Sequence, residues 1–185
     1  MEKYSSEIKM PIEMMSTTRK HSKIINAFVR SVSGVDYNSV DIVTSDCALV
    51  YCGKRNNLDT VKLVDIDKLK NIEYFKEVDI YLFSYVEPDF MMFYKNKFIE
   101  NKRGTRTAGF PDLLIEVWSD GNEDEEKIFK KFLYSTSPLT EHWYVRQNSN
   151  DVECYIGKTP LKIQSLKNIL KMQNGIEFDL RYMTV

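Results

Sequence analysis

The chain has 185 residues, of which 43% are hydrophobic and 12% aromatic, enough for the core of one ordinary domain. Lys and Arg number 26 and Asp and Glu 27, so the formal net charge of -1 excludes a general attraction to polyanions. Three cysteines without paired spacing favour a reducing cytoplasm over a disulfide framework or a zinc cluster, and with no long apolar run we expect neither secretion nor a membrane span.

The chain is expected to open with an amphipathic helix and then to change to strands. Between Pro11 and Ser33, apolar side chains recur at helical spacing. Short runs of β-branched and apolar residues at 40–43 and 48–51 predict two strands.

The charged segment 54–76 is expected to be a peripheral insertion within a single domain of residues 1–185. It would contain a short strand at 62–64 and a short helix at 67–75. Apolar and polar residues alternate over 77–85, and a second apolar run at 90–94 follows a turn or strand start at Pro88.

The clearest unit is a strand, a helix and a strand at 112–118, 122–136 and 141–146, after a glycine-containing loop. That order predicts a βαβ crossover with parallel pairing. The tail predicts a hairpin around Gly157, formed by residues 152–156 and 161–163, and then a short helix at 165–172.

Glu116 interrupts a strand that is otherwise apolar on both faces, so its carboxylate is expected to be buried. A buried carboxylate needs a cation or a hydrogen-bond donor. One hypothesis is a Mg²⁺ or Mn²⁺ ion shared with Asp89, which would lie beside Glu116 if the two strands pair. The alternative is a structural ion pair with Lys or Arg, with Asp89 stabilising the turn after proline.

Taken together, several motifs resemble the Uma-type family, a bacterial branch of the PD-(D/E)xK restriction-endonuclease-like superfamily. The resemblance covers roughly residues 10–157, and segment 54–76 has no counterpart in it. Its most specific part is a Gly-x-Pro-Asp string that leads through apolar residues to a glutamate. The motifs are Val86-Glu87-Pro88-Asp89, Gly109-Phe110-Pro111-Asp112-Leu113-Leu114-Ile115-Glu116-Val117-Trp118-Ser119, Lys130, Tyr134 and Glu141-His142-Trp143-Tyr144-Val145.

The resemblance implies an α/β fold of restriction-endonuclease type, with a mixed central sheet, an N-terminal helix and the βαβ crossover. It also implies Mg²⁺ or Mn²⁺ held by Asp89, Glu116 and the backbone carbonyl of Val117. The superfamily's usual lysine position is occupied here by Trp118, so the resemblance assigns that role to Lys130 on the following helix. Helical periodicity does not choose among Lys127, Lys130 and Lys131, which could all be solvated.

Three further residues are secondary candidates for the same site. Asp112 shares strand parity with Glu116, although a turn-capping aspartate is the competing interpretation. His21 on the opening helix could act as a donor or general base, or could be structural. Glu13 could be a third metal ligand.

Two functional hypotheses follow. The first is a Mg²⁺- or Mn²⁺-dependent nuclease that hydrolyses phosphodiester bonds in DNA. The second is a catalytically inactive nuclease-like domain that binds nucleic acid or protein. A homodimer is one expectation, because nucleases that cut both strands often act as two-fold dimers. A local basic stretch that includes Lys95, Lys97, Lys102, Arg103 and Arg106 could contact phosphates or could be a solvated loop.

Overall fold

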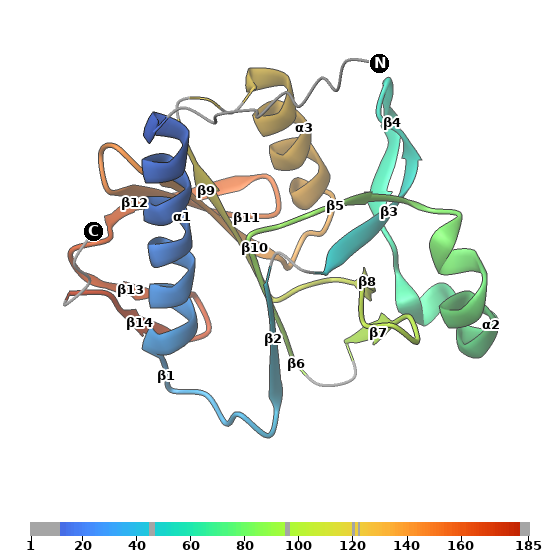
Figure 1. Cartoon of the computed structure of the whole chain (residues 1–185). Helices are drawn as coiled ribbons and strands as arrows, with labels where there is room; N and C mark the ends of the chain where they lie inside the picture. The colour runs from blue at the N-terminus through green and yellow to red at the C-terminus, as the bar shows by residue number, and fades with distance from the viewer. Residues whose placement is uncertain (1–11, 45–46, 95–96, 120, 122, 182–185) are drawn as a thin grey trace, which may run out of the picture.

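The structure is a computed structural model that describes residues 12–44, 47–94, 97–119, 121 and 123–181, with side chains from residue 19 onward (Figure 1). The helices of this part are α1 (Ile12–Ser31), α2 (Ile72–Glu77) and α3 (Asp124–Ser135), with 3-10 turns η1 (Ile66–Lys68) and η2 (Asp79–Tyr81). The strands are β1 (Val32–Ser33), β2 (Val40–Thr44), β3 (Ala48–Lys54), β4 (Asn57–Leu63), β5 (Ser84–Val86), β6 (Phe90–Tyr94), β7 (Phe98–Glu100), β8 (Arg106–Gly109), β9 (Leu113–Trp118), β10 (Glu141–Arg146), β11 (Asp151–Ile156), β12 (Thr159–Ser165), β13 (Ile169–Lys171) and β14 (Glu177–Asp179).

A six-stranded mixed sheet with the order β12-β11-β10-β9-β6-β2 forms the centre of the fold. Strand β9 pairs in parallel with β10 and antiparallel with β6. The predicted mixed α/β class and the parallel β9–α3–β10 unit are therefore confirmed. Apart from the partly exposed Trp118, the residues of β9 are buried, as expected for a strand covered on both faces.

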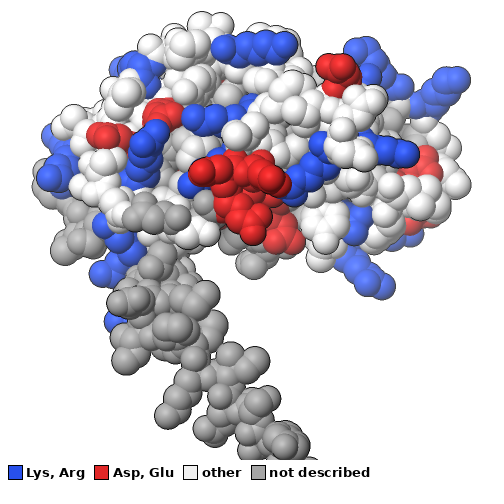
Figure 2. Space-filling view, turned by 90° about the horizontal axis from the view of Figure 1, so that it is seen from above, with Lys and Arg blue, Asp and Glu red and all other residues white. Residues whose placement is uncertain are grey.

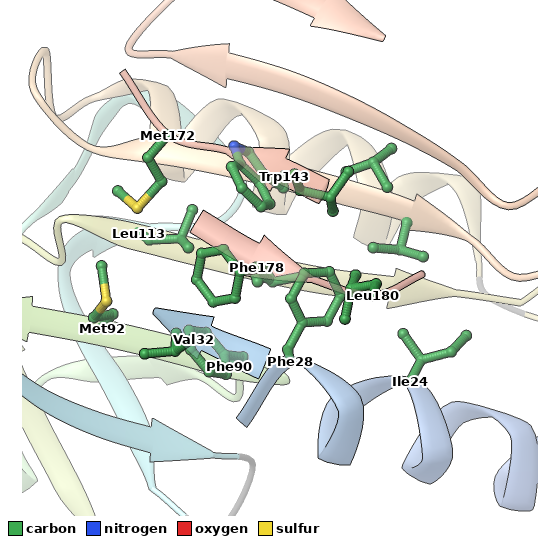
Figure 3. Packing of buried hydrophobic residues seen from close by; sticks show 14 of the residues in the cluster. Ile24, Phe28, Val32, Phe90, Met92, Leu113, Trp143, Met172, Phe178 and Leu180 are labelled. Atoms are coloured by element: carbon green, nitrogen blue, oxygen red, sulfur yellow. The ribbon is translucent and has the colours of Figure 1, made fainter. Parts of the chain in front are cut away.

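Helix α1 covers one face of this sheet, together with the small sheet of order β1-β14-β13. Its residues Ile24 and Phe28 belong to one buried cluster with alternate residues of β9 and β10, among them Ile115 and Trp143. Figure 3 shows Ile24, Phe28 and Trp143 in this cluster. Phe178 of β14 completes this layer, with its ring centroid 5.5 Å from that of Phe28. The odd-numbered residues of β9 therefore face α1.

Helix α3 covers the opposite face, which carries the even-numbered residues of β9. Phe129 and Leu133 of α3 are buried in one cluster with Leu114 of β9 and Tyr144 of β10. The side chain of Glu116 shares this face with Leu114, because side chains alternate along a strand. The position of α3 thus determines which polar groups can reach that carboxylate.

Part of segment 54–76 is buried, which differs from the peripheral place expected for it. Strand β4 begins at Asn57, is longer than predicted, and pairs with β3. Its residues Val61 and Leu63 join the cluster under α3, and the backbone N–H of Leu63 donates to Thr136 Oγ1 at 3.2 Å. The expected single helix at 67–75 is divided into η1 and α2.

Other differences concern short elements whose formation depends on distant partners. Residues 77–85 alternate in polarity but form the end of α2, η2 and only a three-residue strand. The predicted helix at 165–172 is wrong, because residues 169–171 form β13, with Leu170 opposite Phe178. The loop before β9 contains β8, which ends at Gly109 with φ of 137°. A Cβ there would lie 2.3 Å from the carbonyl oxygen of Lys97, so this close approach requires glycine. Among the described helices, none is both long and apolar enough to span a membrane.

Candidate active site

The two acidic residues predicted for the site meet where β6 begins and β9 nears its end. Phe90 and Ile115 are register partners, which places the preceding Asp89 next to Glu116 across the antiparallel pair. Asp89 Oδ2 accepts a hydrogen bond of 2.7 Å from the backbone N–H of Val117. This bond fixes the Asp89 carboxylate against the end of β9.

Glu116 is held by two side chains from α3. Its Oε2 lies 2.8 Å from Lys130 Nζ, and its Oε1 accepts a hydrogen bond of 2.5 Å from the hydroxyl of Tyr134. Lys130 and Tyr134 are four residues apart, so both project from one face of the helix. Lys130 Nζ also donates to the carbonyl oxygen of Glu87 at 3.1 Å, which ties α3 to the turn before Asp89.

The other two candidate lysines of α3 are directed to different partners. Lys127 Nζ lies 3.3 Å from Asp124 Oδ1, and Lys131 Nζ lies 2.9 Å from Glu153 Oε2. Lys131 also sits over the rings of Trp118, Tyr144 and Tyr155. The structure therefore brings only Lys130, of the three, to the Glu116 carboxylate.

The environment of Glu116 favours its neutral form more than water does. Burial raises the pKa of Glu116 to about 7, opposed by the charge of Lys130 and supported by the nearby Asp89. The side chain is 3% exposed, so the desolvation of the carboxylate dominates. An added cation at this carboxylate would offset that desolvation.

His21 approaches the same acids from α1. Its Nε2 lies 3.1 Å from Asp89 Oδ1. The hydrogen bond to Asp89 raises the pKa of His21, against the lowering effect of partial burial. Asp89 thus favours the protonated form of the His21 ring and links α1 to the end of β9.

These groups line one cavity of about 240 Å³ at the end of the sheet, between α1 and α3. Its lining includes His21, Asp89, Glu116, Val117, Lys130 and Gln147. Sequence reasoning assigned no role to Tyr134 or Gln147. The spacing of Tyr134 from Lys130 could have indicated that they share a face, whereas nothing local indicates that Gln147 is buried here.

Asp112 lies apart from this cavity, although it was a candidate for the same site. Its Oδ1 is 2.7 Å from Lys97 Nζ, and its Oδ2 accepts a hydrogen bond from the backbone N–H of Tyr94. It lines a separate cavity of about 320 Å³ with Phe110 and Leu139. Four residues separate Asp112 from Glu116 along an extended strand, so shared parity does not bring them together. The side chain of Glu13 lies outside the described residues.

The charge around the cavity is mixed. The first turn of α3 is acidic, and one of its residues, Glu126, lines the cavity and pairs with Arg55 at 2.5 Å. Figure 2 shows a group of Asp and Glu side chains near the centre of the face it views, with Lys and Arg around them. In the predicted basic stretch, Lys97 and Lys102 pair with acidic residues, and Arg106 donates to backbone carbonyls. Lys95 lies outside the described residues.

The donor set suits a hard divalent cation. Asp89 and Glu116 supply carboxylate oxygens to the same cavity, and Val117 lines it beside them. Within the part of the chain that the structure describes, no cluster of three or more His, Cys, Asp or Glu side chains meets the geometry of a metal site. Among the described residues, the backbone carbonyl of Val117 is the further oxygen donor expected beside the two carboxylates.

Comparison with known proteins places the chain in a family. A family model named Uma2, with the description "Putative restriction endonuclease", matches residues 59–185. The match includes most of segment 54–76, which was expected to have no counterpart, and it does not extend to α1. Among curated proteins, none matches the chain.

The structure is also similar to a solved one, described as "a putative nuclease belonging to DUF820 from Anabaena variabilis ATCC 29413". The TM-score is 0.51 at 12% sequence identity, over 89% of this chain and 79% of the other. At that identity the similarity shows a shared fold. Because the family model spans more than half of the chain, this protein belongs to the Uma2 family, whose restriction-endonuclease-like fold it adopts.

Proposed function

We propose that this protein is a nuclease that hydrolyses phosphodiester bonds in DNA with the help of Mg²⁺ or Mn²⁺. The observation that carries the proposal is the buried Glu116 carboxylate, which lies beside Asp89 and within 2.8 Å of Lys130 in a cavity at the sheet end. Family membership supports the nuclease class. The oxygen donors favour a hard divalent cation.

Asp89 and Glu116 would hold the cation, with the carbonyl of Val117 as a further ligand. A bound divalent cation supplies Lewis-acid polarisation of the phosphate and a lowered pKa for a coordinated water. Tyr134 keeps Glu116 in position through its hydroxyl. The bond from Val117 N–H does the same for Asp89.

Lys130 and His21 would serve the phosphate as cations. Lys130 carries a compact ammonium with three donors, which suits stabilisation of the charge that develops during attack by water. The raised pKa of His21 favours its protonated form, and that form can donate a hydrogen bond or a proton. Lys130 and His21 come from opposite faces of the sheet, so a phosphate in the cavity would lie between them.

A cleavage assay tests the proposal. Supercoiled plasmid, single-stranded DNA and RNA are incubated with the wild type and with Glu116→Gln, in Mg²⁺, in Mn²⁺ and in EDTA. We expect DNA cleavage by the wild type that EDTA abolishes, and a loss of about 100-fold or more in Glu116→Gln. Glu125→Gln, on the exposed side of α3, is the matched control and should cleave normally.

Equal cleavage by wild type and Glu116→Gln would reject the proposal. Retained DNA binding without cleavage by the wild type would favour the second hypothesis, a nuclease-like binding module. Cleavage of both strands at one position would support a two-fold homodimer, which sedimentation analysis in the presence of DNA would test.

A further inference from the structure

Gln147 occupies the position directly after β10, at the same edge of the sheet as the end of β9. Its backbone N–H donates to the carbonyl oxygen of Trp118 at 3.1 Å, which extends the parallel pairing by one residue. The residue is 3% exposed, yet it lines the cavity that contains Asp89 and Glu116. Gln147 is therefore fixed by its backbone beside the proposed site.

The side-chain amide of Gln147 lacks the hydrogen-bond partner that a buried polar group normally has. Its Nε2 is buried and has no hydrogen-bond partner among the described residues. Most buried polar atoms in proteins are paired, because a donor removed from water without a partner lowers the stability of the fold. A buried donor without a partner at the edge of a cavity is consistent with a partner supplied by a ligand.

The surroundings indicate which ligand would suit this donor. Gln147 follows the parity of Trp143 and Val145, so its side chain belongs to the α1 face, whereas Glu116 and Lys130 lie on the α3 face. The acids of the cavity would be engaged by a cation. The phosphate oxygens of a substrate would then be the acceptors available to a neutral amide donor.

We propose that the Gln147 side-chain amide donates a hydrogen bond to an oxygen of the substrate phosphate, from the side of the cavity opposite Lys130. This inference rests on the proposed nuclease function for its substrate class. It gives Gln147 a direct contact with the substrate, and it supplies the hydrogen-bond partner that the buried Nε2 lacks among the described residues.

The test combines stability and binding, because a structural role and a substrate role predict opposite results. Gln147→Leu removes the unpartnered amide, so its melting temperature should equal or exceed that of the wild type. Gln164→Leu is the matched control, since the Gln164 amide contacts Cys154 Sγ and the backbone N–H of Lys171. Its loss should lower the melting temperature and leave phosphate binding unchanged.

Binding is measured with dimethyl phosphate, a phosphodiester whose calcium salt is soluble, in the presence of Ca²⁺, as the phosphate-dependent rise in melting temperature. We expect this rise in the wild type and in Gln164→Leu, and its loss in Gln147→Leu and in the near-isosteric Gln147→Glu. The rate of DNA cleavage by Gln147→Leu should fall by about 10-fold to 100-fold.

Two outcomes would overturn the inference: an equal phosphate response in wild type and Gln147→Leu, including no response in either, or a clear drop in the melting temperature of Gln147→Leu. The result is separable from that of the proposed function. If the wild type fails to cleave DNA while its phosphate response depends on Gln147, the nuclease proposal fails and the phosphate contact stands. If Gln147→Leu responds to phosphate and cleaves DNA as the wild type does, the contact fails and the nuclease proposal stands.

Discussion

Lys130 Nζ lies 2.8 Å from Glu116 Oε2 and 3.1 Å from the carbonyl oxygen of Glu87, so one ammonium joins α3, β9 and the turn before β6. In the free protein, the Lys130 ammonium pairs with the Glu116 carboxylate. When a metal ion engages that carboxylate, Lys130 can instead interact with the substrate phosphate. Lys130 is therefore the residue of α3 whose loss should affect catalysis most.

Replacement of Lys130 by alanine should reduce DNA cleavage by about 100-fold or more, because the charge that develops on the phosphate loses its nearest ammonium. Lys127→Ala is the matched control, since Lys127 lines the same cavity but pairs with Asp124. Its rate of DNA cleavage should fall by less than about 5-fold, because only the attraction of the substrate phosphates is weakened. Initial rates at saturating Mg²⁺ measure both variants, and equal rates in the two would remove Lys130 from the mechanism.

Asp89→Asn should abolish cleavage while the fold is retained, because an amide oxygen can still accept the hydrogen bond from Val117 N–H but carries no charge for a cation. The same change should lower the pKa of His21 toward its ordinary value, since the Asp89 hydrogen bond is the largest cause of its raised pKa. Proton NMR titration of the His21 ring measures this shift.

Asp112→Asn is the matched control for Asp89→Asn, because it removes the charge of an aspartate outside the proposed site. It should leave the pKa of His21 and the cleavage rate unchanged, because Asp112 lines the other cavity and pairs with Lys97. Stability alone should fall, by about 1 kcal/mol, as a charged hydrogen bond is weakened. A large loss of cleavage in Asp112→Asn would contradict the division between the two cavities.

Glu116→Gln should change stability in a pH-dependent way. The folded-state pKa of Glu116 is raised from 4.5 to about 7, so its carboxyl favours folding below pH 4.5 and this contribution is lost as pH rises through 7. The variant should therefore be more stable than the wild type at pH 8, by about 3 kcal/mol, and equal to it near pH 4. Urea unfolding at both pH values measures the difference.

Metal should remove most of this difference at pH 8. Mn²⁺ at about 100 times its Kd stabilises a folded protein by about 2.7 kcal/mol, and the wild type should gain this while Glu116→Gln gains little. A Mn²⁺ effect of the same size in both proteins would show that Glu116 is not a ligand.

The sequence predicted the centre of this fold because β9 and α3 have strong local patterns. An apolar strand interrupted only by Glu116 indicates burial on both faces, and Asp89 was expected beside Glu116 if the two strands pair, which they do. The role of Lys130 could not be derived from periodicity. Its side chain lies at the flank of the buried stripe, and its partners are determined by the pairing of β6 with β9, which brings the Glu87 carbonyl and Glu116 together.

The remaining differences come from contacts between residues distant in the sequence. Leu166 and Leu170 have helical spacing. However, Leu170 of β13 lies opposite Phe178 of β14, and this tertiary contact outweighs the weak local preference for a helix. Gln147 has no local pattern that separates it from an exposed polar residue of a turn. Its burial depends on the cavity formed by α1, β9 and α3 together.

The chain has two histidines, and their environments shift their pKa values in opposite directions. Nε2 of His142 lies 2.8 Å from the carbonyl oxygen of Gly157, so it must carry the proton, and Nδ1 then accepts from the Tyr144 hydroxyl at 2.8 Å. Burial of this neutral ring lowers the pKa of His142 to about 4, whereas Asp89 raises the pKa of His21.

The two shifts have opposite effects on stability. The contribution of neutral His142 is present above pH 6.5 and is lost as pH falls toward 4, by about 3 kcal/mol in total. That of His21 is present below pH 6.5 and is lost as pH rises through its raised pKa. As the pH falls, the stabilising contribution of Glu116 increases over much of the range in which that of His142 is lost. The loss of stability caused by His142 should therefore be easiest to measure in Glu116→Gln. His142→Gln in that background should remove it, and His21→Gln should not. Two histidine resonances that titrate together near pH 6.5 would contradict both environments.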